Sequence, residues 1–103
     1  MKIHGNWCGP DWTDGKAQSA ETYRLAGGDF RGRCIDAVDC ACRAHDKDCS
    51  HPDGCSRRGD LALIMAMSRY RANPINRIRH PIISARARAI RAGILLAMPF
   101  RSR

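Results

Sequence analysis

Apolar side chains that recur every three or four residues predict three helices in the chain. In the first, Val38 and Cys42 share one face with His45. Asp36 suits the N-cap position, because its carboxylate can accept a hydrogen bond from a free backbone N–H. The pattern predicts a helix over about residues 36–50.

A second helix is expected over about residues 56–72. Its apolar side chains fall on one stripe that contains Leu61, Ile64 and Met65. Pro74 ends it, because proline disfavours helical backbone in the residue before it. The turn between the first two helices is short, so they should lie antiparallel as neighbours. His45, late in the first helix, can then approach Asp60, early in the second.

The third helix is expected over about residues 82–98, and Pro81 suits its first turn. Its apolar stripe consists of Ile83, Ala87, Ile90, Ile94 and Ala97. Residues 75–81 precede it as a basic connector.

Residues 1–33 contain too many glycines for a long helix. A short helix fits residues 17–25, and no segment predicts a convincing strand. We therefore expect a mainly α fold, in which an N-terminal loop region precedes two antiparallel, disulfide-linked helices and a third, C-terminal helix.

Composition limits the class of protein. A chain of 103 residues forms one domain, and 44% hydrophobic residues exclude a disordered polyelectrolyte. No apolar run is long enough for a transmembrane helix. All six cysteines lie in the first 55 residues, which favours disulfides and an oxidising compartment. We expect a secreted or otherwise exported protein, although residues 1–6 contain no apolar signal segment.

Two segments carry the strongest functional signal. Trp7-Cys8-Gly9 lies in a loop rich in glycine, and five residues of the first helix follow at characteristic spacing: Asp36, Asp39, Cys42, His45 and Asp46. Together they resemble the secreted phospholipase A2 family, whose aromatic-Cys-Gly loop binds calcium and whose Asp-x-x-Asp-x-Cys-Cys-x-x-His-Asp helix is catalytic. The spacing after Gly9 is more similar to the plant and bacterial members. The resemblance covers residues 5 to about 65.

The resemblance implies a calcium loop over about residues 5–16. Calcium takes six to eight oxygen ligands, which bent glycine-rich backbone and a carboxylate can supply. The implied ligands are the carbonyls of Trp7 and Gly9, one carbonyl from Asp11 or Trp12, and the carboxylate of Asp46. A surface turn without a metal is the alternative interpretation of this loop.

The resemblance also implies a reaction, the hydrolysis of the sn-2 ester of a glycerophospholipid. His45 would take a proton from the attacking water, and Asp60 would orient the ring. The backbone N–H of Gly9 would stabilise the oxyanion. The alternative for Asp60 is a favourable charge at a helix N-terminus.

The sequence departs from the family pattern in the catalytic helix. The family's adjacent cysteines are Ala41-Cys42 here, and Cys49 stands where the family often has a supporting tyrosine. Tyr23 or Tyr70 could replace that tyrosine, and the sequence leaves this open.

The resemblance implies a disulfide between Cys8 and Cys42. For the other four cysteines, a bond between Cys49 and Cys55 would close the short turn between the helices. Cys34 would then pair with Cys40, while other pairings of these four stay open.

A zinc site is the alternative for the cysteines, because six potential ligands are dense here: Cys40, Cys42, His45, Cys49, His51 and Cys55. Cys40 and Cys42, however, point to different sides of the predicted helix, so they cannot bind one ion there. We therefore expect disulfides rather than zinc.

The net charge of +8 suggests an anionic partner. Arg86, Arg88 and Arg91 flank the apolar stripe of the third helix, a pattern typical of a membrane-surface helix. Aromatic residues are sparse there, which argues against nucleic acid. We expect an anionic phospholipid membrane as partner, with a merely solvated helix face as the alternative. A phospholipase-like module that binds or disrupts membranes without catalysis is the second functional hypothesis.

Overall fold

The computed structural model describes residues 1–103 as a mainly helical chain with one small antiparallel sheet. In chain order its elements are β1 (Trp12–Thr13), β2 (Lys16–Ala17), α1 (Ala20–Leu25), α2 (Ala37–Cys49), α3 (Arg57–Ala72), α4 (Pro74–Arg79), α5 (Pro81–Ala97) and a 3-10 turn, η1 (Met98–Phe100). The mainly α fold class is confirmed.

The two central helices begin at capping residues that the sequence supplies. The Asp36 carboxylate accepts a hydrogen bond from the Asp39 N–H at 2.8 Å, and the Ser56 hydroxyl accepts one from the Gly59 N–H at 2.9 Å. These side chains satisfy N–H groups that have no partner within their helix. The predicted helices over 36–50 and 56–72 are therefore confirmed to within a residue or two.

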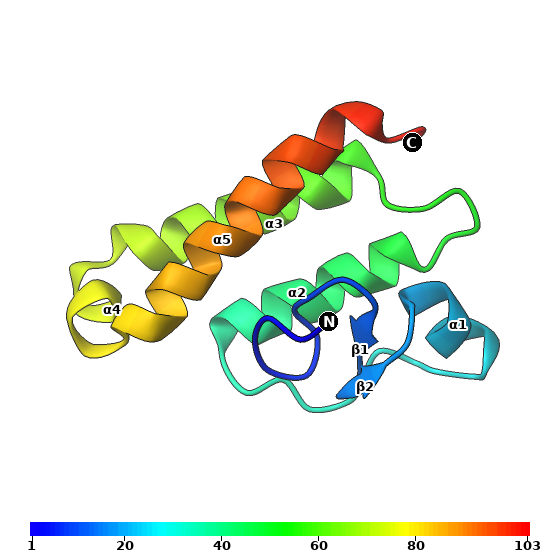
Figure 1. Ribbon diagram of the computed structural model, residues 1–103, viewed down its shortest axis with the longest axis horizontal. Coiled ribbons are helices and arrows are strands. Elements are labelled where there is room, and N and C mark those ends of the chain that lie inside the picture. The colour runs from blue at the N-terminus through cyan, green and yellow to red at the C-terminus, as the bar shows by residue number, and fades with distance from the viewer.

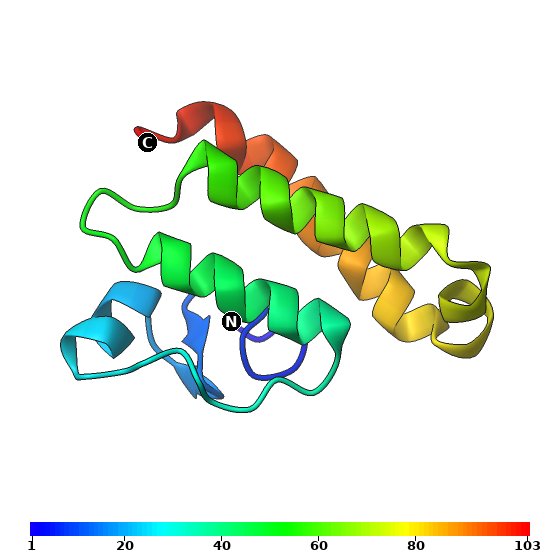
Figure 2. The ribbon, with the colours of Figure 1, turned by 180° about the vertical axis from the view of Figure 1, so that it is seen from behind.

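The helices are arranged in successive layers (Figure 1). The N-terminal loops, the small sheet and α1 lie against one side of α2, and α3 runs antiparallel to α2 on its other side. The view from behind shows α5 packed along α3 (Figure 2). The core joins these layers through Trp7, Cys8, Phe30, Val38, Cys42, Leu63, Met67, Ala87 and Ile90.

The segment expected to be a basic connector, residues 75–81, does connect α3 to α5, but most of it forms the helix α4, which was not expected. The Asn73 side chain accepts a hydrogen bond from the Ile75 N–H at 3.0 Å, and Pro74 occupies the first turn of α4. Proline can end one helix and begin another, because a helix's first N–H groups have no partner within it. This short helix reverses the chain between α3 and α5.

The expectation of no strand is also wrong, since β1 and β2 form a two-residue hairpin. Thr13 pairs with Lys16, and the turn residues Asp14 and Gly15 have φ of 52° and 71°. Positive φ at both turn positions is typical of a type I′ hairpin, for which Asp-Gly is a preferred sequence. The signal was present in the sequence, but the strands are too short to show an alternating pattern.

Three disulfides are present, Cys8–Cys42, Cys34–Cys40 and Cys49–Cys55, and no cysteine is free. The expected pairing is confirmed. Three disulfides in 103 residues fit an oxidising, extracellular environment. None of the helices has the length and apolarity needed to cross a lipid bilayer.

Candidate active site

The helix pair brings His45 of α2 and Asp60 of α3 together, as the sequence predicted. His45 Nε2 lies 2.7 Å from Asp60 Oδ1. The His45 side chain is 10% exposed and that of Asp60 is fully buried. Such a short contact inside the protein fixes the orientation of the ring.

This contact also decides which ring nitrogen is free for chemistry. An ionised carboxylate only accepts hydrogen bonds, so in the neutral ring Nε2 carries the hydrogen and Nδ1 keeps its lone pair. Nδ1 lies 3.6 Å from the Cys49 sulfur. His45 thus has the arrangement of a general base, with one nitrogen held by a carboxylate and the other available.

The turn between α2 and α3 holds these two residues in register. The Cys49–Cys55 bond closes it. The Asp48 carboxylate accepts hydrogen bonds from the backbone N–H and the hydroxyl of Ser56, each at 2.7 Å. The start of α3 is therefore tied to the end of α2 by a covalent bond and by hydrogen bonds.

Arg101 is a site residue that the sequence analysis missed. Its Nε donates to Asp60 Oδ2 at 2.7 Å, and its Nη2 donates to Asp60 Oδ1 at 3.3 Å. Burial by itself would raise the pKa of Asp60, but the hydrogen bonds and charges of Arg101 and His45 outweigh it and hold this pKa below its ordinary value. The carboxylate is therefore ionised. Nothing in the sequence indicates this pairing, because 41 residues separate the partners.

Asp46 is the next residue of α2, and its carboxylate has no such partner. Its Oδ2 is buried without a hydrogen bond. Burial, and then the negative charge of Asp39, raise the pKa of Asp46 to about 8. A buried oxygen without a partner, close to a second carboxylate, is an environment that a cation would stabilise.

The loop beside Asp46 is held by Asp39, which is fully buried. The Asp39 carboxylate accepts hydrogen bonds from the backbone N–H groups of Asn6, Trp7 and Ile35 at 2.9–3.1 Å. Gly5 lies so close that a Cβ there would be 2.3 Å from the carboxylate carbon. Asp39 therefore fixes the loop to α2, a role beyond the favourable first-turn charge that its position suggests.

The four predicted carbonyl donors differ in their availability. The carbonyls of Trp7 and Asp11 accept no hydrogen bond within the protein, whereas that of Gly9 accepts the Trp12 N–H at 3.3 Å. The Trp12 indole donates to the Gly5 carbonyl at 3.0 Å, and Trp12 does not line the pocket described below. Of the two residues considered for the third carbonyl, Asp11 thus has a free carbonyl and lines the pocket, whereas Trp12 does not line it.

A pocket of about 610 Å³ connects these groups. Its lining includes polar groups of Gly9, Asp11, His45, Asp46 and Arg101. The helices α3 and α5 contribute an apolar wall with Leu63, Ala89, Ile90, Gly93, Ile94 and Ala97. Gly9 lines this pocket, and its backbone N–H makes no hydrogen bond within the protein. The arrangement suits a molecule with a polar reactive group and an apolar tail.

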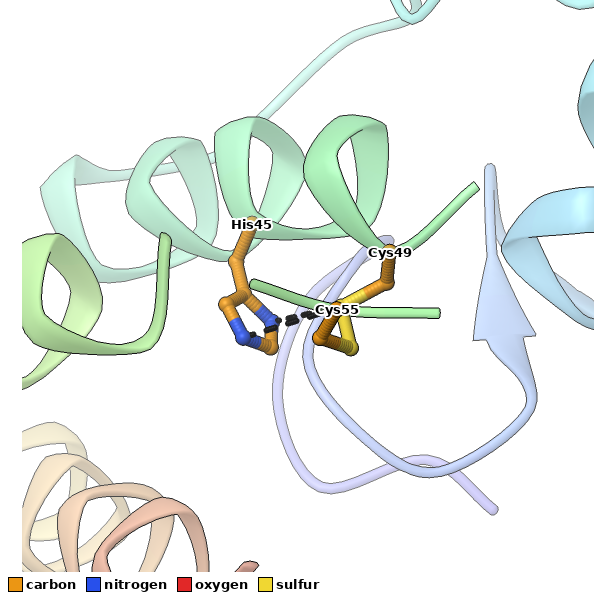
Figure 3. A group of neighbouring side chains, drawn as sticks. All are labelled: His45, Cys49 and Cys55. Atoms are coloured by element: carbon orange, nitrogen blue, oxygen red, sulfur yellow. Dashed lines mark hydrogen bonds between the residues drawn. A yellow bond between two sulfur atoms is a disulfide. The ribbon is translucent and has the colours of Figure 1, made fainter. Parts of the chain in front are cut away.

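The zinc alternative is wrong for a chemical reason. Atoms of His45, Cys49 and Cys55 lie within 4.8 Å of one another, a spacing that a metal site could have. Figure 3 shows, however, that the two sulfurs are bonded to each other. Zinc binds cysteine as the thiolate, and disulfide sulfurs do not carry that charge.

Neither tyrosine considered at the sequence level supports Asp60. The Tyr23 hydroxyl accepts the Phe30 N–H at 3.2 Å, and its ring packs against Trp7. Burial, and then the charge of Asp36, raise the pKa of Tyr70, which places that phenol near the start of α2. The supporting position is occupied by Arg101 instead.

Two of the arginines assigned to a membrane-facing surface have partners within the protein. Arg86 Nη1 lies 3.2 Å from His4 Nδ1, and Arg91 Nε donates to the Ser68 hydroxyl at 3.0 Å. Arg86 and Arg91 therefore join α5 to the N-terminal region and to α3. Of the three, only Arg88 makes no side-chain hydrogen bond or ion pair.

No known protein family, curated protein or solved structure matches this chain. The function is therefore argued from the residues and the geometry of the site.

Proposed function

We propose that the protein is a calcium-dependent phospholipase A2, which hydrolyses the sn-2 ester of glycerophospholipids to a lysophospholipid and a fatty acid. One observation carries the proposal. His45, held by Asp60, lines the same pocket as the unpartnered carboxylate of Asp46. The sequence resemblance to the secreted phospholipases A2 supports the same reaction.

The residues of the pocket can divide the chemistry between them. His45 Nδ1 takes a proton from a water molecule as that water attacks the ester carbonyl, while Asp60 stabilises the imidazolium that forms. The N–H of Gly9 donates to the developing oxyanion. His45 then returns the proton to the leaving alkoxide, so the reaction consumes only one water.

The residues beside the base fit a hard cation. Asp46 would supply a carboxylate, and Trp7 and Asp11 would supply free carbonyls. When bound, calcium would polarise the ester carbonyl and attract the phosphate of the lipid. The carbonyl of Gly9, which is bonded to Trp12 in this structure, would have to leave that bond to become a further ligand.

The apolar wall of the pocket supports a lipid as substrate. Small residues of α5, Ala89 and Gly93, leave room beside Ile90 and Ile94 for an acyl chain. Burying a CH₂ group contributes about 0.8 kcal/mol, so even part of a long chain would bind well here.

An exposed apolar strip borders this wall and supports a bilayer surface as partner. Ile82, Ala89 and Leu96 are seven residues apart, which places them on one side of α5, and Phe100 follows in η1. Ile82, Leu96 and Phe100 are 66%, 76% and 87% exposed. The helix contains no acidic residue, and the net charge of +8 would favour anionic lipids. Three disulfides support an exported protein that meets such membranes outside the cytosol.

The decisive experiment measures fatty-acid release from phospholipid vesicles labelled in the sn-2 chain. We expect release with calcium, none in excess chelator, and almost none for Asp46→Asn. Mass spectrometry should find the label in the free acid rather than in the lysophospholipid. Full activity in chelator would contradict the calcium mechanism, and vesicle binding or leakage without any release would favour the non-catalytic module.

A second experiment tests the membrane-binding strip. The double variant Leu96→Ser, Phe100→Ser should bind anionic vesicles more weakly than the wild type. Leu25→Ser is the matched control, because Leu25 is 70% exposed but lies on α1. Equal binding by all three proteins would show that the strip does not contact the bilayer.

A further inference from the structure

We propose that Arg101 is a positioning residue, which holds the Asp60 carboxylate in the orientation that keeps His45 aligned for catalysis. This inference rests on the proposed function and extends it to a residue outside the sequence resemblance. Arg101 acts through Asp60 and is not itself assigned to the reacting atoms.

The geometry of the contact carries the inference. Asp60 Oδ1 receives both His45 Nε2, at 2.7 Å, and Arg101 Nη2, at 3.3 Å, while Oδ2 receives Arg101 Nε at 2.7 Å. The guanidinium thus binds both oxygens of the carboxylate and leaves it one orientation. In that orientation the remaining lone pairs of Oδ1 are directed to the histidine.

Burial makes this contact consequential. The Asp60 side chain is fully buried and that of Arg101 is 22% exposed. Without Arg101, His45 would be the only side chain donating a hydrogen bond to this buried carboxylate, and Oδ2 would have no donor. Such a group would rotate or take up a proton, and either change would weaken its hold on the ring.

Hydrogen bonds hold the segment that carries Arg101 in place. The Arg101 N–H donates to the Met98 carbonyl of η1 at 3.2 Å. The Ser102 hydroxyl donates to the Asp53 carbonyl in the α2–α3 turn at 3.1 Å, and the Arg57 N–H at the start of α3 donates to the Arg103 carbonyl at 3.2 Å. The backbone on both sides of Arg101 is therefore fixed next to Asp60. The interaction joins the segment after α5 to the α2–α3 pair at the catalytic histidine.

Arginine is suited to this role in a way that lysine is not. Its planar group can donate two hydrogen bonds to one carboxylate, whereas an ammonium group is a point charge on a flexible stem. We therefore expect Arg101→Lys to retain the charge but only part of the alignment, and Arg101→Gln to lose both.

The first test separates positioning from substrate binding by steady-state kinetics on vesicles. For Arg101→Gln we expect kcat to fall by about 10- to 100-fold with little change in KM, and for Arg101→Lys a smaller fall in kcat. Arg58→Gln is the matched control, since Arg58 is exposed on α3 and its side chain makes no hydrogen bond or ion pair. An unchanged kcat with a raised KM would overturn the proposal and assign Arg101 to binding the lipid phosphate.

The second test does not depend on activity. In protein labelled with ¹⁵N-histidine, the His45 Nε2–H should give a downfield proton signal in the wild type and in Arg58→Gln. This signal should broaden or disappear in Arg101→Gln while circular dichroism shows intact helices. If the signal is unchanged in Arg101→Gln, the positioning role is wrong. If the wild type shows the signal but hydrolyses no lipid, the proposed function fails while the role of Arg101 in holding the pair is still decided.

Discussion

The two halves of the molecule are held together in different ways. Residues 1–55 contain all three disulfides and the buried carboxylate of Asp39, which binds three backbone N–H groups. Residues 56–103 contain only helices and their connections, and α3 packs on α5 through apolar side chains. Loops need specific bonds to hold one shape, whereas amphipathic helices need mainly a shared apolar surface.

The candidate site lies where these halves meet. His45 and Asp46 come from the disulfide-bonded half, and Asp60 and Arg101 come from the helical half. The first half would provide the base and the oxygen ligands, and the second would provide the group that orients the base. The following predictions test this division, from the largest expected effect to the smallest.

The largest effect is expected from replacing either member of the proposed catalytic pair, His45 or Asp60. His45→Gln removes the base and should lower the rate of hydrolysis by about 10²- to 10⁴-fold, with calcium binding retained. Asp60→Asn should lower the rate of hydrolysis by a smaller factor, because Asp60 orients the base and does not itself accept the proton from water. Rates measured on one vesicle preparation decide this, and near-normal turnover by His45→Gln would reject the assignment.

Removing the disulfide that joins the N-terminal loop to α2 should destabilise the protein strongly. The double variant Cys8→Ala, Cys42→Ala should lose about 2–5 kcal/mol of unfolding free energy and bind calcium more weakly. The matched control is Cys34→Ala, Cys40→Ala, which opens a loop with a sequence separation of 6 instead of 34.

Opening the shorter Cys34–Cys40 loop should lower the unfolding free energy by less, because closing a short loop removes less entropy from the unfolded chain. Urea unfolding of both variants measures the difference. Equal losses, or no change in calcium affinity for the Cys8–Cys42 variant, would argue that this bond does not stabilise the loop.

The helical half should respond to the loss of buried volume. Met67 is fully buried in the core, so Met67→Ala should cost about 2–5 kcal/mol. Met65 lies on the same helix but is 48% exposed, and Met65→Ala should change the stability by less than about 0.5 kcal/mol. Thermal unfolding of the two variants gives the comparison. Similar shifts would mean that α3 is not packed as the structure shows.

The smallest effect is expected from the pH dependence of Asp60. Its pKa in the folded protein lies below the ordinary value, so the ionised form stabilises the fold above that value, and this contribution is lost as the pH falls through the folded pKa. The stability difference between the wild type and Asp60→Asn should therefore shrink on acidification below about pH 4. Asp53→Asn, at an exposed position, is the control. A difference that stays constant down to pH 2 would contradict the ionised pair.

The sequence predicted much of the disulfide-bonded half because its signals are local. Asp36 as a cap and the spacing of Cys42, His45 and Asp46 depend only on residues within one helix. The short turn before α3 then limited the choice of a partner for His45 to Asp60. The hairpin at Asp14-Gly15 and the helix after Asn73 also have local signals, but both elements are too short to show a repeating pattern of apolar residues.

By itself, the sequence determined the main helices and the approach of His45 to Asp60, because both follow from helical period, capping chemistry or chain connectivity. The Cys8–Cys42 bond was implied by the family resemblance, and the pairing of the other four cysteines was left open until the structure decided it. Only the tertiary structure decided that Arg101 binds Asp60, that Asp39 holds the N-terminal loop and that Asp46 Oδ2 is left without a partner. It also decided that Arg86 and Arg91 bond within the protein. These facts depend on which surfaces come together in space, and the packing of helices distant along the chain leaves no repeating pattern in the sequence from which they could be predicted.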